Sequence, residues 1–145
     1  MPDLVDMDRA ECERLLRRGT FGRVVLVTPS GPEIVPVNYT VVDDAVVVLT
    51  TSTGMLARRG NRRRLAFEVD HVDHDRWHGW SVVARGLGEV VVNPQDGVPG
   101  RVLLRPWADG DRSTELRIAW TELTGRRVGT AWDAEGGMYS RRTAR

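Results

Sequence analysis

The chain has 145 residues, a formal net charge of +1 and a single cysteine, Cys12. This length suits one domain with a sizeable core, and the balanced charge argues against a dedicated nucleic-acid-binding protein, which normally has a strong basic excess. The lone cysteine excludes an intrachain disulfide and a cysteine-based zinc site. All 21 basic residues are arginine, which excludes Schiff-base and lysine general-base chemistry.

No apolar run approaches the length of a membrane span, and the N-terminal residues lack a basic segment followed by an apolar stretch. We therefore expect a cytoplasmic protein that has neither a membrane nor a nucleic acid as its partner.

The first predicted element is an amphipathic helix over residues 9–18. Asp8 and Glu11 have the spacing of an acidic capping box, and Gly19 is a natural stop. Three apolar side chains follow at helical spacing and predict a buried face with a packed, unreactive thiol: Cys12, Leu15 and Leu16. We expect this helix to cover a β-barrel.

Runs of β-branched residues bounded by turn formers predict six strands. They cover residues 20–28, 33–42, 45–51, 65–72, 79–92 and 114–124. Pro36 favours an edge position for the second strand, and Gly86 and Gly88 predict a bulge or bend in the fifth. Short connections between such strands are typical of an antiparallel barrel.

Two segments have weaker patterns. Residues 95–113 indicate a weak helical turn and an irregular segment around Trp107. Gly, Ser, Arg and small residues dominate after Val128, which predicts an extended or mobile tail. The expected organisation is one domain over residues 1–128 and a tail over 129–145.

The third predicted strand ends in a run of hydroxyl residues before a short helix at about residues 54–60. Hydroxyls and free backbone N–H groups at a helix N-terminus suit a phosphate group. Five arginines follow, and we expect one or two of them to contact a ligand while the others form a solvated face: Arg58, Arg59, Arg62, Arg63 and Arg64.

All three histidines lie within residues 70–78, interleaved with aspartates. A metal site needs ligands that converge from a rigid frame, and His74 and His78 would converge only on a helix. We interpret this segment as a polar hairpin loop. No Gly-x-Ser-x-Gly elbow is present, so a Ser-His-Asp centre is not expected.

The chain has five tryptophans, whose flat faces suit a planar cofactor ring or a subunit interface. We expect Trp120 to lie in the core. The other four are Trp77, Trp80, Trp107 and Trp132.

In their order, these pieces resemble the pyridoxamine 5′-phosphate oxidase-like split-barrel proteins, in particular small actinobacterial flavin-binding members and nitroimidazole-reductase-like relatives. The resemblance covers about residues 4–128. The matching segments include Glu11-Cys12-x-x-Leu15-Leu16, Gly22-Arg23-Val24, Pro36-Val37-Asn38-Tyr39, Thr50-Thr51-x-x-Gly54, Ala66-Phe67-Glu68-Val69-Asp70, Gly79-Trp80-Ser81-Val82, Arg105-Pro106-Trp107 and Thr124-Gly125-Arg126-Arg127.

The resemblance implies a mainly β protein with short helices. Its expected fold is a six-stranded antiparallel split β-barrel of the FMN-binding type, which forms a homodimer with two cofactor sites at the interface. FMN is the usual cofactor of such proteins, the deazaflavin F420 serves some relatives, and a few bind heme.

Site residues are implied in three sets. The isoalloxazine and ribityl chain would be lined by Val37, Asn38, Tyr39, Thr50 and Thr51. Thr53 and Gly54, with the short helix, would face the phosphate. The ring would be approached by Trp80, Ser81 and Val82, with Trp107 and Arg126 near it, some of them from the partner subunit.

One position departs from the pattern. Many relatives have a phosphate-binding lysine just after the glycine of the short helix, where this chain has Met55. Arg58 or Arg59, one turn further on, could replace it. Losing one charge-assisted hydrogen bond would cost about 1.5–3 kcal/mol of binding.

The function implied by the resemblance is a flavin- or F420-dependent oxidoreductase that acts on an unidentified small molecule. We assign no catalytic acid or base, because hydride passes directly between substrate and ring in such sites. Two alternatives are a non-catalytic module that binds flavin or heme, and a cofactor-free specialised enzyme on the same barrel. Oxidation of pyridoxamine phosphate itself is not expected, since the chain is short for that enzyme.

Overall fold

The structure is a computed structural model, and it describes residues 4–94 and 113–128. Its elements in chain order are β1 (Leu4–Asp6), α1 (Arg9–Arg18), β2 (Phe21–Thr28), β3 (Gly31–Asn38), β4 (Thr40–Val42), β5 (Ala45–Thr50), α2 (Met55–Arg59), β6 (Arg64–Asp73), β7 (His78–Val92) and β8 (Thr114–Val128). The helical turn and irregular segment expected over 95–113 lie almost wholly outside the described residues, as do Trp107, Trp132 and the tail.

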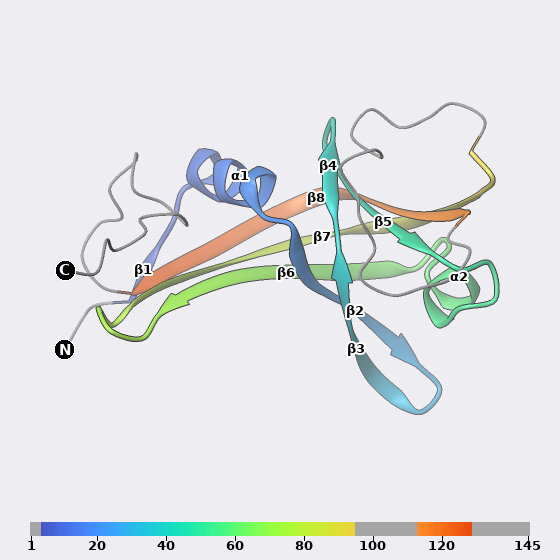
Figure 1. Cartoon of the computed structure of the whole chain (residues 1–145), viewed down its shortest axis with the longest axis horizontal. Coiled ribbons are helices and arrows are strands. Elements are labelled where there is room, and N and C mark those ends of the chain that lie inside the picture. Colours follow the sequence, from blue (N-terminus) through green and yellow to red (C-terminus); the bar gives the residue numbers. More distant parts are fainter. Residues whose placement is uncertain (1–3, 95–112, 129–145) are drawn as a thin grey trace, which may run out of the picture.

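The strands form one antiparallel sheet in the order β3-β2-β6-β7-β8-β5-β4, with β1 added to β8. Figure 1 shows the long strands β6, β7 and β8 side by side, with the β2–β3 hairpin crossing them at one edge. Neither described helix has the length and apolar content that are needed to cross a bilayer.

The two end strands of this order, β3 and β4, are consecutive in the chain and only Tyr39 separates them. One end pairs with β2 and the other with β5, so the covalent chain itself links the two edges of the curled sheet. Within the described residues no backbone ladder joins β3 to β4. The barrel is therefore split, and Tyr39 occupies the corner at which it turns.

The six predicted strands are all present, two of them need a main correction of their bounds, and one further strand was missed. The second one, predicted over residues 33–42, is divided at Tyr39 into β3 and β4. The last one was expected to end near residue 124, but it continues to Val128 because its final residues pair with both β1 and β7. Strand β1, only three residues long, has no detectable pattern in the sequence.

Glycine allows the bend in β7 that the sequence predicted. The pairing of β7 with β8 shifts register between Arg85 and Gly86. A Cβ atom at Gly86 would lie 1.9 Å from the Ala119 carbonyl oxygen. No larger residue fits so close to a neighbouring backbone, which explains how this bulge can tighten the curvature.

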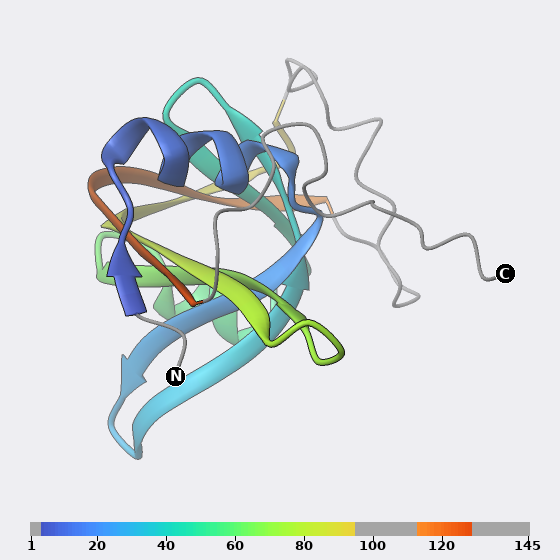
Figure 2. The same ribbon diagram turned by 90° about the vertical axis from the view of Figure 1, so that its left-hand side faces the viewer.

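Helix α1 lies across one side of the curled sheet, as Figure 2 shows. The predicted cap is present, since the Glu11 N–H donates to Asp8 Oδ1 at 2.8 Å. Arg17 attaches the exposed side of the helix to the sheet: it binds Asp44, and its guanidinium lies 5.6 Å from the ring centroid of Trp120. It also pairs with Glu13 within the helix. The predicted covering helix is thus confirmed.

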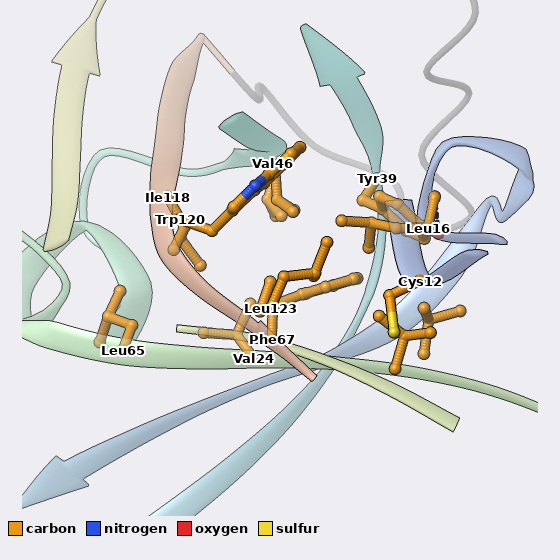
Figure 3. Close-up of a cluster of buried hydrophobic side chains, with 14 of the residues drawn as sticks. Cys12, Leu16, Val24, Tyr39, Val46, Leu65, Phe67, Ile118, Trp120 and Leu123 are labelled. Atoms are coloured by element: carbon orange, nitrogen blue, oxygen red, sulfur yellow. Dashed lines mark hydrogen bonds between the residues drawn. The ribbon is translucent and has the colours of Figure 1, made fainter. Parts of the chain in front are cut away.

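The core lies between α1 and the inner face of the sheet. Figure 3 shows α1 side chains on one side of it and β5 and β8 side chains on the other. Phe67 is fully buried near its centre. Truncation of such a side chain typically costs 3–5 kcal/mol. The labelled core residues are Cys12, Leu16, Val24, Tyr39, Val46, Leu65, Phe67, Ile118, Trp120 and Leu123.

Candidate functional site

The predicted site residues separate into three places on the chain. One group surrounds α2, a second lies where β6, β7 and β8 end, and a third follows β3 into the barrel corner. Figure 1 shows α2 and the β6–β7 turn at opposite ends of the molecule. A strand rises about 3.3 Å per residue, so roughly 40 Å of chain separates Thr114, beside α2, from Arg126.

Hydroxyl groups converge at the α2 end. A Cβ atom built on Gly54 would lie 2.9 Å from Thr51 Oγ1 and 3.1 Å from Thr50 Oγ1. Thr50 pairs with Thr114, which is fully buried and whose Oγ1 has no hydrogen-bond partner. Sequence reasoning missed Thr114, because only the pairing of β5 with β8 brings it here. This end therefore offers several hydroxyl donors around a residue without a side chain.

Helix α2 itself contributes less to an anion site than the sequence predicted. It has only five residues, so its dipole is small, and Gly54 as N-cap makes no side-chain hydrogen bond. Met55, at the position where the resemblance implies a lysine, packs against the core. The positive charges on this helix are Arg58 and Arg59 in its last turn, both of them exposed. An anion here would rely on hydroxyls and arginine.

The third group serves the barrel rather than an open site. Tyr39 is 3% exposed, its hydroxyl donates to the Leu16 carbonyl oxygen at 2.6 Å, and its ring lies 4.5 Å from that of Phe67. Val37 packs against the core, and Asn38 Nδ2 donates to the Thr20 carbonyl oxygen at 3.4 Å. The only side-chain oxygen of Tyr39 thus holds α1.

A cleft of about 640 Å³ lies at the other end, where β1, β6, β7 and β8 meet. Ser81 pairs with both Asp70 and Arg126, so three strands place these side chains in one row. The cleft is lined by Leu4, Asp70, Val72, Asp73, His74, Trp77, His78, Gly79, Trp80, Ser81, Arg126 and Val128. It thus contains three predicted site residues, Trp80, Ser81 and Arg126.

Trp80 and Val82, both predicted for the site, lie in different surroundings. Trp80 is 3% exposed and its ring centroid lies 6.5 Å from that of His71, yet its Nε1 has no hydrogen-bond partner. Indole N–H groups usually find an acceptor when buried, so this unpartnered donor is unusual among the residues that line the cleft. Val82, in contrast, is fully buried in the core and its side chain does not line the cleft.

The charges of the cleft are largely paired. Arg23 binds Asp70 at 2.8 Å and Glu68 at 2.6 Å. The hydrogen bond with Glu68 is the main cause that raises the pKa of Arg23 above its ordinary value, so the guanidinium stays charged. Asp73 Oδ1 accepts the N–H groups of Asp75 and Arg76, both at 3.1 Å. Among the described residues, no group of acidic, histidine or cysteine side chains could hold a metal ion.

Trp77 is the main lining residue that sequence reasoning did not assign to the site. It lies on the turn between β6 and β7, is 78% exposed and has a φ of 56°. A bulky residue in this left-handed region is uncommon. The available signal was a tryptophan at the last position of a polar hairpin loop, where glycine or asparagine is usual.

Comparison with known proteins places these features in a family. Residues 8–127 match the family described as pyridoxamine 5′-phosphate oxidase. The uncharacterized protein Rv0080 of Mycobacterium tuberculosis is 36% identical over 131 residues, which are 87% of this chain and 86% of that protein.

Solved structures share the fold. The FAD binding protein from Mycobacterium smegmatis has a TM-score of 0.66 and 25% identity, covering 86% of this chain and 98% of its own. The FAD and heme binding protein from the same organism has a TM-score of 0.65 and 17% identity, covering 90% and 77%. These neighbours confirm the predicted mainly β split-barrel class. With residues 8–127 matched, the chain belongs to the pyridoxamine 5′-phosphate oxidase family.

Proposed function

We propose that this protein is a homodimeric, cytoplasmic, flavin-dependent oxidoreductase whose cofactor site is shared between two protomers. The observation that carries the proposal is the separation of two complementary half-sites on one chain. The α2 end has groups that suit a phosphate, and the cleft end has groups that suit a planar ring. Among the described residues, the hydroxyl cluster with its arginine pair lies at the α2 end, and the aromatic wall lies at the cleft end.

The residues at the α2 end fit a phosphate group. Thr50 and Thr51 direct hydroxyls toward Gly54, the buried Thr114 hydroxyl lacks a partner, and two exposed arginines follow in α2. Charge-assisted hydrogen bonds from arginine bind phosphate strongly. In this proposal Thr50, Thr51, Thr53, Gly54, Arg58 and Arg59 hold the phosphate end of the cofactor.

The residues at the cleft end fit a planar heteroaromatic ring. Apolar side chains and Trp80 form part of the cleft, and Ser81 and Arg126 can bind polar ring atoms. A bound flavin supplies the hydride acceptor or donor, while the chain supplies orientation and hydrogen bonds and excludes water. We propose that Trp80, Ser81 and Arg126 have this task, and that a small-molecule substrate enters the same cleft.

A two-fold dimer would let one protomer's α2 end complete the other's cleft, because such an interface presents the same surface from both subunits. A surface for this contact exists on the outer face of the sheet. Val27, Ile34 and Leu87 are 75%, 64% and 62% exposed on β2, β3 and β7. Apolar side chains exposed together on a sheet often mark a protein interface.

The cofactor is proposed as FMN, with FAD and F420 as the nearest alternatives. FAD is included among the alternatives because the Mycobacterium smegmatis protein with 25% identity is an FAD binding protein. The purified protein should be titrated separately with FMN, FAD, F420 and hemin, while light scattering after size-exclusion chromatography gives the oligomeric state. Micromolar or tighter binding of a flavin by a dimer is expected. A monomer that binds none of the four would refute the proposal.

Mixed dimers test the sharing of the site. Arg58→Glu/Arg59→Glu removes the phosphate half-site, and Ser81→Trp fills the ring half-site. Each variant alone should lose flavin binding, but dimers formed after mixing and subunit exchange should recover one intact site out of two. Arg62→Glu/Arg63→Glu is the charge-matched control and should bind like the wild type. If mixing restores nothing while dimers exchange, the site is not shared.

A non-catalytic flavin- or heme-binding module is the second candidate. Met55 favours it, because this side chain packs on the core and leaves the usual lysine contact unmade. Reduction of the bound flavin by a nicotinamide donor, followed by reoxidation with an electron acceptor, supports the enzyme. A bound flavin that no donor reduces, or a Soret band from bound heme, supports the module.

A further inference from the structure

Trp77 has a conformation that its own surroundings do not explain. Its φ of 56° lies in the left-handed region, and the residue occupies the last position of the β6–β7 loop, where hairpins usually have glycine or asparagine. The Asp73 carboxylate fixes this turn through the N–H groups of Asp75 and Arg76. The loop therefore holds a bulky residue in a strained backbone conformation.

Packing does not compensate for this strain, because the Trp77 residue is 78% exposed. An exposed indole gains little from the hydrophobic effect, whereas strained residues cluster at ligand sites. Two further exposed apolar residues line the same cleft as Trp77: Val72 and Leu4, which are 54% and 58% exposed. The three side chains give the cleft an apolar wall with one flat aromatic face.

The polar side of the cleft includes one arginine, Arg126, that can pair with an anion. Both acidic groups that line it are engaged, Asp70 by Arg23 at 2.8 Å and Asp73 by the turn that it caps. Arg126 has a weaker attachment: within residues 4–94 and 113–128 it binds Asp6 at 3.2 Å, and the two side chains are 63% and 87% exposed. Ion pairs this exposed contribute little, so a ligand carboxylate can displace Asp6.

We propose that this cleft binds a planar aromatic carboxylate, whose ring stacks on Trp77 and whose carboxylate pairs with Arg126. The volume of about 640 Å³ is ample for a two-ring ligand. Trp77 thereby acts as a positioning residue, and Arg126 selects the anion. The idea that this ligand is the substrate of a flavin-dependent reaction rests on the proposed function. The existence of the binding site does not.

The test uses the full chain with benzoate, 2-naphthoate and quinoline-2-carboxylate, each compared with its neutral carboxamide. Titration calorimetry gives the dissociation constants. The indole N–H signals in ¹⁵N–¹H spectra show which tryptophan is affected, and Trp77→Phe assigns the Trp77 signal. Each titration is made with and without FMN, so that a failure of flavin binding is seen separately from a failure of the cleft.

The two-ring acids should bind with saturation, shift the Trp77 indole signal and exceed their carboxamides at least tenfold in affinity. Trp77→Gly should weaken the acids at least tenfold and leave the thermal midpoint unchanged or higher, because glycine relieves the strained φ. Arg126→Gln should abolish the preference for the acid over the carboxamide. Arg63→Gln, which removes an exposed charge outside the cleft, should change neither property.

Three results would overturn the inference. One is the absence of binding by all three acids at millimolar concentration, with and without FMN. Another is binding that Trp77→Gly leaves intact. The third is a Trp77→Gly protein that loses its dimeric state or its thermal stability, which would make Trp77 a structural or interface residue.

Discussion

The role of Tyr39 can be tested by removing a single oxygen atom. The Tyr39 hydroxyl is buried and donates to the Leu16 carbonyl oxygen at 2.6 Å, near the C-terminus of α1. In Tyr39→Phe the ring can remain against Phe67, but the carbonyl loses its partner in a buried place. Leaving a buried acceptor unsatisfied costs about 1–3 kcal/mol, so we expect a loss of about 1–2 kcal/mol in the free energy of unfolding.

Gly19 provides a matched second substitution. A Cβ atom there would lie 2.0 Å from Tyr39 Oη, whereas the next atoms, Tyr39 Cζ and Val69 Cγ2, are at 3.0 and 3.2 Å. Gly19→Ala should therefore destabilise the wild type by more than it destabilises Tyr39→Phe, in which the nearest obstacle is gone. For two residues in contact, the coupling energy of the double-mutant cycle should be about 1 kcal/mol or more.

Urea unfolding of the four proteins measures this cycle, and FMN titration of the same samples separates structure from ligand binding. Because Tyr39 has a structural role, Tyr39→Phe should bind FMN within about threefold of the wild type at a temperature where both are folded. The reasoning is refuted if Tyr39→Phe is as stable as the wild type. A tenfold loss of FMN affinity at unchanged stability would instead restore Tyr39 as a cofactor residue.

Three further predictions follow from the same core. Burial raises the pKa of Tyr39 above its ordinary value of about 10. Its contribution to stability is therefore complete below pH 10 and falls as the pH rises above it, because the unfolded chain then loses a proton that the folded one keeps. Urea midpoints at increasing pH should decline less in Tyr39→Phe than in the wild type, and parallel curves would contradict this. Burial, with the nearby Glu11, also raises the pKa of the Cys12 thiol. Iodoacetamide at pH 8 should therefore label Cys12 only after unfolding. Rapid labelling of the folded protein would show that α1 opens. Gly86→Ala should lower the free energy of unfolding by more than about 2 kcal/mol, because its Cβ meets a carbonyl oxygen at 1.9 Å. Gly79→Ala, whose Cβ has its nearest atom at 3.1 Å, should lower the free energy of unfolding by less. Equal thermal midpoints of the two variants would contradict the close approach at Gly86.

Local chemistry made much of the fold predictable from the sequence. Alternating β-branched runs located the six long strands, because the two-residue period of a strand sorts its side chains between core and surface. The capping pair Asp8 and Glu11 located the start of α1, and Gly86 located the bulge in β7. Each of these features depends on neighbours within a few residues, so a single sequence contains the information.

The boundaries that the sequence missed depend on distant partners. Strand β8 continues past Gly125 because β1, from the other end of the chain, pairs with its last residues. Likewise β3 and β4 look like one strand in the sequence. Only the different partners of its two halves, β2 and β5, reveal the corner at Tyr39.

The sequence by itself determined the strands, the covering helix and the residue types from which a site can be built. Tertiary structure decided which of these residues meet. The pairing of Ser81 with Arg126 and of Thr50 with Thr114 joins residues far apart in the chain. Tertiary structure also places the α2 end far from the cleft and directs Tyr39 into the core. The physical reason is that side-chain periodicity is local, whereas strand register is set by contacts between segments that only folding brings together.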